Sequence, residues 1–245
     1  MDERLRLTLL GHFAAFRRGA PLTGFESNKV RGLLAFLAVE QARGHSRASL
    51  IGLLWPDWPE SSARRNLSQA LFNLRQTLDD QNAQTPFLLV SRQEIRWNRA
   101  APADIDGQQV LALLPEPGQI PDPAKMEQVS SLYRGRLLER FSLDDSDIFD
   151  HWLLTKREWL HGRVMAALHH YAQGLLSGGV AHFDTAHAII SQQLLLEPWQ
   201  EEAHSQMMRL LAARGQRSAA LAQFELCRAA LAAELGVEPS QETLA

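Results

Sequence analysis

The sequence predicts a mainly α-helical protein in which a small α+β domain precedes an all-α domain of helical repeats. Apolar residues of the first hundred positions change from a period of two to a period near 3.6, whereas the second half keeps helical spacing almost throughout. Between the two parts, five of the eleven prolines lie within residues 102–123, and proline is excluded from helix interiors and central strands. We therefore expect two domains, residues 1–100 and residues 101–245.

The two parts also differ in charge. The whole chain carries 25 Lys and Arg against 28 Asp and Glu, a net charge of −3 that by itself discourages a nucleic-acid partner. Residues 1–99, however, hold 14 basic and 9 acidic residues, a net charge of +5, which leaves −8 for the rest of the chain. This asymmetry predicts that a polyanion would meet the first domain and be repelled by the second.

Composition and motifs exclude several classes of protein. The single cysteine excludes an intramolecular disulfide framework, and the chain has neither an apolar run of 18 residues nor the features of a signal peptide, which fits a cytoplasmic protein. Phosphate-binding glycine loops, the nucleophile elbow and the zinc-protease motif are missing. His182 and His187 are five apart and do not share a helical face, and the acidic residues 144–147 lack the pattern of a calcium loop. We therefore expect no enzyme, no cofactor and no metal.

The first hundred residues predict a short β meander, three helices and a hairpin. Leucines alternate over residues 5–9 as in a strand, and helical spacing begins at Ser27 and continues up to Gly44. Ser46 has the character of an N-cap for a short helix that Pro56 ends, and a third helix begins near residue 61.

Two alternating runs, residues 88–90 and 95–97, flank a turn with hairpin spacing. Strands, three helices and a basic hairpin in this order are typical of a winged helix-turn-helix.

The third of these helices has a polar face that suits contact with DNA bases. At 100° per residue its alanines and leucines share one stripe, which predicts the buried side. Amides pair bidentately with adenine, arginine pairs with guanine, and an exposed aromatic ring can contact the thymine methyl group. A contact with another protein is the alternative explanation for the one aromatic ring. The polar face consists of Arg65, Ser68, Gln69, Phe72, Asn73 and Gln76.

Two sets of segments carry a family resemblance. LLWPD, followed by ARRNL and LFNLR, resembles the OmpR-type winged helix that begins the Streptomyces antibiotic regulatory proteins (SARPs). YRGRLLERF, HWLLTKREWL and LLLEPWQEEAHSQMMRLLAARG resemble the bacterial transcriptional activator domain that follows it in that family. The resemblance covers about residues 5–243 and is weakest over 112–130.

The resemblance implies that the third helix enters the major groove and that the hairpin, the wing, contacts the backbone or the minor groove. The wing is shorter than is usual in the family and lacks its glycines. The residues implied to contact bases are Arg65, Ser68, Gln69, Phe72 and Asn73. Those implied to hold phosphates are Ser46, Arg47, Arg64, Arg75, Arg92 and Arg96.

The second half predicts antiparallel helices of the kind found in tetratricopeptide-like repeats. Helical spacing holds over residues 149–176, 184–196, 200–213 and 218–235, and glycine or proline stands at the ends of these segments. Helices of this length joined by short turns form stacked hairpins.

The sequence therefore predicts a sequence-specific DNA-binding transcriptional regulator, and the resemblance implies an activator. Its implied partners are double-stranded promoter DNA with direct repeats, RNA polymerase and a second copy of the chain. No contact with a membrane is expected. The implied location is the nucleoid in the cytoplasm. Two alternatives stay open. One is a protein-interaction scaffold whose winged helix has lost DNA binding. The other is the N-terminal regulatory part of a larger signalling protein, because relatives carry ATPase or phosphopeptide-binding domains beyond this point.

Overall fold

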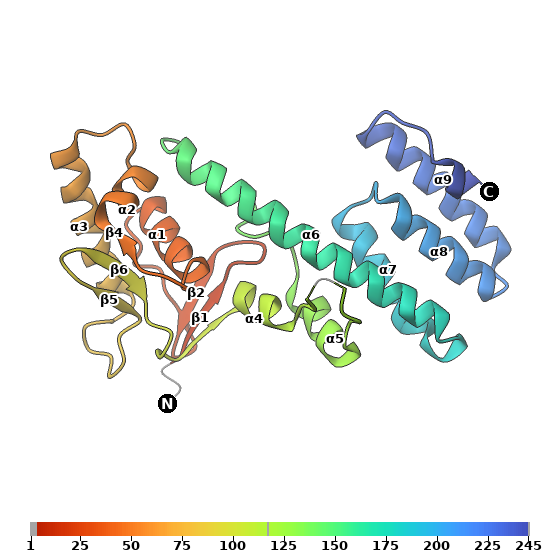
Figure 1. Ribbon diagram of the computed structural model, residues 1–245, viewed down its shortest axis with the longest axis horizontal. Coiled ribbons are helices and arrows are strands. Elements are labelled where there is room, and N and C mark those ends of the chain that lie inside the picture. Colours follow the sequence, from red (N-terminus) through yellow and green to blue (C-terminus); the bar gives the residue numbers. More distant parts are fainter. Residues whose placement is uncertain (1–3, 117, 245) are drawn as a thin grey trace. The chain divides into compact units, whose positions relative to one another are not determined.

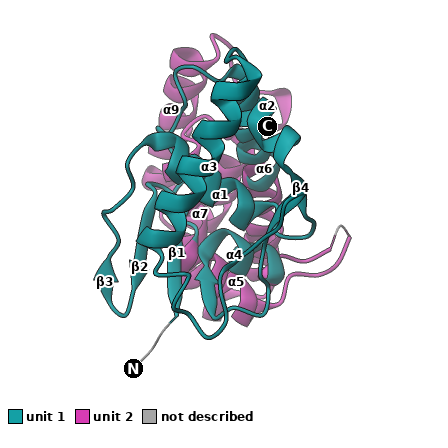
Figure 2. Cartoon of the chain, turned by 90° about the vertical axis from the view of Figure 1, so that its left-hand side faces the viewer, with its two compact units in different colours: residues 1–112, 133–160 teal, residues 113–132, 161–245 magenta. Residues whose placement is uncertain are grey.

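The computed structural model describes residues 4–116 and 118–244 (Figure 1). The chain forms two compact units, one of residues 1–112 and 133–160 and the other of residues 113–132 and 161–245 (Figure 2). These units are divided differently from the predicted domains, which stay a prediction. The chain returns to the first unit because residues 136–138 pair with the end of the first strand: the N–H of Leu138 donates to the carbonyl of Leu9 at 2.6 Å.

The first unit begins with a four-stranded sheet in the order β3-β2-β1-β7. β1 (Leu5–Thr8), β2 (Ala14–Arg17) and β3 (Ala20–Pro21) form the predicted antiparallel meander. β7 (Ala103–Ile105) pairs with β1 in parallel, which the sequence did not predict. The leucines of β1 are fully buried, so the alternating pattern does mark the core side of this sheet.

Three helices and a second, smaller sheet complete the winged helix-turn-helix. The second sheet has the order β4-β6-β5, and short β4 was not predicted. Leucines of all three helices are buried together, as their helical spacing requires. α4 (Asp106–Leu113) follows β7. The helices are α1 (Asn28–Val39), α2 (Arg47–Leu54) and α3 (Glu60–Thr77), and the strands are β4 (His45–Ser46), β5 (Leu88–Val90) and β6 (Glu94–Trp97).

The second unit is helical, and the prediction of a mainly α fold with a repeat-like second half is confirmed. α7, α8 and α9 follow one another closely, and each packs against the next in sequence (Figure 1). A glutamine side chain also joins α9 to α8, since Gln223 Nε2 donates to His204 Nδ1 at 2.7 Å. α5 was missed. The helices are α5 (Pro123–Leu132), the part of α6 (Asp147–Ser177) from His161 onward, η1 (Val180–His182), α7 (Phe183–Leu196), α8 (Glu201–Ala213), α9 (Arg217–Glu234) and α10 (Gln241–Leu244).

Candidate nucleic-acid interface

The candidate interface is built on α2, α3 and the turn between them. Ser46 has an extended backbone before α2, and its Oγ accepts a hydrogen bond from the N–H of Ser49 at 3.0 Å, which confirms the predicted N-cap. The same hydroxyl lies 2.8 Å from Ser49 Oγ. α2 ends at Leu54, directly before Trp55 and the proline that cannot continue the helix. This arrangement fixes where α3 begins relative to α2.

α3 presents the predicted polar face to solvent, with one exception. Its alanines and leucines from Ala63 to Leu74 are buried, and the side chains of Arg65, Ser68, Gln69 and Phe72 are exposed. Phe72 is 55% exposed, which is unusual for an aromatic ring on a helix packed into a core. Ser68 Oγ donates to the carbonyl of Arg64 at 2.9 Å and keeps its lone pairs outward. Four of the five residues expected at bases therefore lie on one accessible surface.

Asn73 is the exception, and the expectation that it lies on the exposed face is wrong. Its side chain is buried, its Nδ2 donates to the carbonyl of Gly24 at 2.9 Å and its Oδ1 accepts from the N–H of Glu26 at 3.1 Å. Both functional groups of the amide are used to hold the segment before α1 against α3. Asn73 is thus a structural residue, since its amide is buried and bonded to the backbone and is not accessible to a base.

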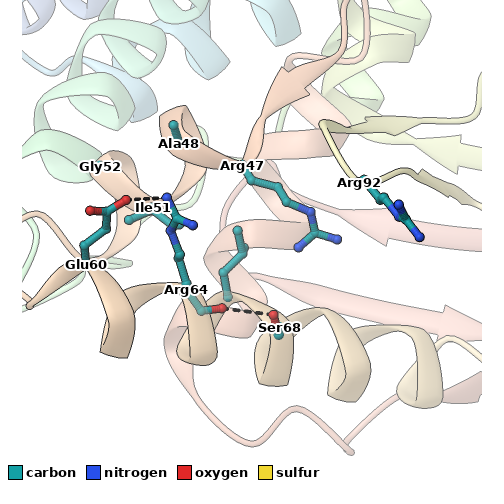
Figure 3. Close-up of a pocket in the computed structure, with 9 residues that line it drawn as sticks. Arg47, Ala48, Ile51, Gly52, Glu60, Arg64, Ser68 and Arg92 are labelled. Atoms are coloured by element: carbon teal, nitrogen blue, oxygen red, sulfur yellow. Dashed lines mark hydrogen bonds and ion pairs between the residues drawn. The ribbon is translucent and has the colours of Figure 1, made fainter.

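A pocket of about 580 Å³ opens between α2, α3 and the β5–β6 turn (Figure 3). Guanidinium groups of Arg47, Arg64 and Arg92 reach it from three different elements. The N–H of Arg47 donates to the carbonyl of Gln93 at 3.1 Å, and its Nε donates to the carbonyl of Ser91 at 3.2 Å. These bonds join the start of α2 to the wing, so Arg47 is held in place at the mouth of the pocket.

Two of the basic residues expected at phosphates already have carboxylate partners. Arg64 forms an ion pair with Glu60 one turn earlier on α3, and both side chains are well exposed. Arg75 Nε lies 3.6 Å from Asp80 Oδ2, and Asp80 is buried. Burial raises the pKa of Asp80, against hydrogen bonds from the N–H groups of Phe87 and Leu88 and the charge of Arg75. A phosphate would compete with Glu60 for Arg64 and with Asp80 for Arg75.

The wing is closed without the glycines of the family pattern. Ser91 Oγ accepts from the N–H groups of Gln93 at 3.2 Å and Glu94 at 2.9 Å, and the N–H of Ser91 donates to the carbonyl of Glu94 at 2.9 Å. A serine side chain therefore supplies the closing bonds of a turn that glycine usually makes possible. The wing residues Arg92 and Arg96 are both exposed.

Sequence reasoning missed two features of this surface. Glu60 opens α3 as a first-turn acidic residue, and its i,i+4 spacing to Arg64 could have indicated the pair. Ser91 gave no comparable signal, because its role depends on the backbone of the turn. In the described ranges 4–116 and 118–244, no group of three or more histidine, cysteine or acidic side chains could hold a metal ion. Within the same ranges no helix combines the length and apolarity that crossing a bilayer requires.

Comparisons with known proteins agree with this geometry. Residues 121–245 match the family described as the bacterial transcriptional activator domain. A solved structure of Mycobacterium tuberculosis EmbR, in complex with a low-affinity phosphopeptide, is similar with a TM-score of 0.66 and 20% sequence identity. That similarity covers 98% of this chain and 62% of the EmbR chain, and it shows the shared fold. No curated protein matches the chain.

A winged helix-turn-helix followed by a helical-repeat unit is the fold that this chain shares with EmbR, and its helical part matches the bacterial transcriptional activator domain. The family match covers half of the chain. The chain therefore belongs to the family of proteins with a bacterial transcriptional activator domain, as the sequence resemblance implied.

Proposed function

We propose that this chain binds promoter DNA through its first unit and activates transcription there. The observation that carries the proposal is the basic pocket of Arg47, Arg64 and Arg92, which opens beside the exposed face of α3. A helix with a free polar face next to guanidinium groups matches what major-groove binding requires: phosphate contacts that position the protein and base contacts that select the sequence.

Within this interface, the residues proposed to contact bases are Arg65, Ser68, Gln69 and Phe72. The exposed Phe72 ring suits contact with a thymine methyl group, whereas Gln69 has both amide groups available for adenine. Arg47, Arg92 and Arg96 are proposed as the main phosphate contacts. Arg64 and Arg75 are proposed as weaker ones, because each is paired with a carboxylate, and Ser46 as weaker because it is neutral and caps α2.

The remaining partners follow from the family. RNA polymerase is the proposed second partner, and a second copy of the chain would match direct repeats in the promoter. The proposed location is the nucleoid. Because residues 113–132 and 161–245 hold 11 acidic and 6 basic residues, the second unit is disfavoured next to phosphates and is left for protein contacts.

A protein-interaction scaffold is the second candidate function. The observation in its favour is Phe72, since an exposed aromatic ring on a helix surface is also typical of a protein contact. On this alternative the first unit would show no salt-sensitive binding to DNA.

Binding of the full chain to a pool of random-sequence duplexes separates these functions. We expect salt-dependent binding by fluorescence anisotropy and a preferred sequence after repeated selection from the pool. Arg47→Ala should weaken binding to all sequences and lower the slope of log K against log salt by about one. Arg217→Ala is the matched control, because Arg217 is an exposed arginine of α9 in the acidic half. A wild-type chain that binds no duplex at low salt would leave the scaffold as the better explanation.

A further inference from the structure

A second basic pocket of about 250 Å³ lies in the first unit at the other end of the wing sheet. Arg43, Arg96 and Arg99 line it together with Leu89, Trp97 and Asn98, and none of its lining residues is acidic. All three arginines are exposed. Neither Arg43 nor Arg99 belongs to the recognition helix or to the tip of the wing, so this pocket is separate from the one between α2 and α3.

The strand register shows how the two basic pockets are related. His45 pairs with Ile95 and Ser46 with Glu94, so Arg43 and Arg47 flank β4. Arg92 lies in the turn two residues before β6, and Arg96 lies within the last two residues of that strand. Four residues of extended chain span about 13 Å, which places the second pocket about that distance along the sheet from the first.

The arginines of this pocket are available and held in place. Arg96 and Arg99 form no ion pair with any carboxylate in the part of the chain that is described. Ile95 and Trp97 are buried on the opposite side of β6, which turns Arg96 outward.

Asn98 fixes the turn that carries Arg99. Its N–H donates to the carbonyl of Phe87 at 2.8 Å, its Nδ2 donates to that of Pro86 at 2.7 Å, and its Oδ1 accepts from the N–H of Ala100 at 3.1 Å.

Glu40, the residue that caps the C-terminus of α1, does not neutralise Arg43. Glu40 and Arg43 attract each other electrostatically, but the carboxylate of Glu40 is bound by Lys156 Nζ at 2.8 Å and Trp152 Nε1 at 2.9 Å. The positive charge of Arg43 is therefore left for a partner outside the chain.

Glu94 separates the two pockets. A Cβ placed on Gly44 would lie 2.5 Å from Glu94 Oε2, so the carboxylate rests directly over the glycine between the two groups of arginines. Two anion sites with a negative charge between them suit two separate phosphates better than one long anion.

We infer that Arg43, Arg96 and Arg99 hold a backbone phosphate of the same duplex, beyond the one at Arg47 and Arg92. This inference rests on the proposed DNA binding. It adds Arg43 and Arg99 to the interface and extends the footprint on the wing side. With β6 running along the duplex axis, where phosphates on one strand are about 3.4 Å apart, the added contact lies about four base pairs further out.

The test compares Arg43→Ala/Arg99→Ala with the wild-type chain on a duplex selected by the wild type. We expect the slope of log K against log salt to fall by about 0.9 for the lost phosphate and the selected base sequence to stay the same. Hydroxyl-radical protection should be lost at the wing edge only. Arg43→Lys/Arg99→Lys keeps both charges and should keep most of the slope. Arg209→Ala/Arg217→Ala, two exposed arginines of the second unit, is the control.

A duplex shortened by about four base pairs on the wing side gives a second measurement that needs no variant. The wild type should lose the same factor in affinity on this duplex as the double alanine variant loses on the full one. Unchanged binding of the wild type to the shortened duplex would overturn this inference and leave the proposed DNA binding in place. A wild type that binds neither duplex would overturn the proposed function and this inference with it.

Discussion

The amide of Asn73 donates a hydrogen bond to the backbone carbonyl of Gly24 at 2.9 Å across two segments that are 49 residues apart in sequence. Thr77 Oγ1 donates to the same carbonyl at 3.0 Å, and Asn73 Oδ1 accepts from the N–H of Glu26. The buried side of α3 is thus anchored to the chain that leads into α1, while Phe72, the neighbour of Asn73, faces solvent. Adjacent residues of α3 divide the anchoring of the helix, at Asn73, from the proposed base contact, at Phe72.

Asn73→Ala should destabilise the protein without changing its sequence preference. The substitution leaves the N–H of Glu26 without its partner, whereas the carbonyl of Gly24 keeps Thr77, so a loss of about 1–3 kcal/mol in the free energy of unfolding is expected. Urea denaturation measures this loss. Gln69→Ala, on the exposed face, is the contrast: it should stay within about 0.5 kcal/mol of the wild type and alter the selected DNA sequence. A changed sequence preference in Asn73→Ala with unchanged stability would contradict the structural role.

Glu40 should make the stability of the first unit depend on pH. Burial by itself raises the pKa of Glu40, but hydrogen bonds from Lys156 and Trp152 and the charges of Lys156 and Arg43 outweigh it and hold the pKa below its usual 4.5. A lowered pKa in the folded state means that the stabilisation is present above 4.5 and is lost as the pH falls through the folded pKa. Glu40→Gln keeps an acceptor for Trp152 Nε1 and removes the charge that faces Lys156.

The difference in unfolding free energy between wild type and Glu40→Gln should therefore be about 0.5–1 kcal/mol at pH 7, because the pair is partly exposed, and should shrink below pH 4.5. Parallel urea titrations at several pH values measure it. A difference that stays constant down to pH 3 would show that the effect of the substitution is steric and not electrostatic.

Arg157 should be required for the turn that returns the chain to the first sheet. Its guanidinium donates to the carbonyls of Leu137 at 2.6 Å, Leu138 and Phe141 at 2.9 Å. Leu138 has a positive φ of 48°, an unfavourable conformation for a branched residue that these bonds help to hold.

Arg157→Met should cost about 2–4 kcal/mol, since more than one partly buried carbonyl loses its donor. Arg157→Lys should recover only part of this loss, because an ammonium group cannot reproduce the planar fork. Thermal unfolding measures both. Arg136→Ala is the control, as Arg136 pairs with Glu158 at the surface and should cost less than about 1 kcal/mol. Equal stability of Arg157→Met and Arg136→Ala would remove the proposed role of Arg157.

Hydrophobic periodicity predicted the helices well, because each buries one face over several turns. α7 begins one residue before its predicted start at residue 184 and ends at the predicted residue 196. β4 and β7 were missed since each is very short and gains its stability from partners far away in sequence. α5 was missed because the prolines around residue 123 indicated a linker, although proline is tolerated in the first turn of a helix.

At the candidate site, periodicity predicted which face of α3 is exposed but could not assign Asn73. This residue lies at the border of the two faces, and its polar side chain favoured the solvent side. Its partners are backbone groups of residues 24 and 26, which no side-chain pattern reveals. The pocket of Arg43 and Arg99 was missed for a similar reason, since it forms only when the register of β4 and β6 brings separate arginines together.

The negative charge of Glu94 should weaken DNA binding by the wild-type protein. Removing this charge therefore tests where the phosphates lie. Its carboxylate lies over Gly44, between the arginines of the two basic pockets, where it would repel a nearby phosphate. Glu94→Gln keeps the shape of the side chain and removes the charge, so affinity should rise several-fold at low salt and the gain should fade as salt screens the repulsion. Anisotropy titrations with one selected duplex at increasing KCl measure this. Glu234→Gln at the end of α9 is the matched control and should bind as the wild type does. If Glu94→Gln binds no more tightly than this control at low salt, the duplex does not pass along this side of the wing sheet.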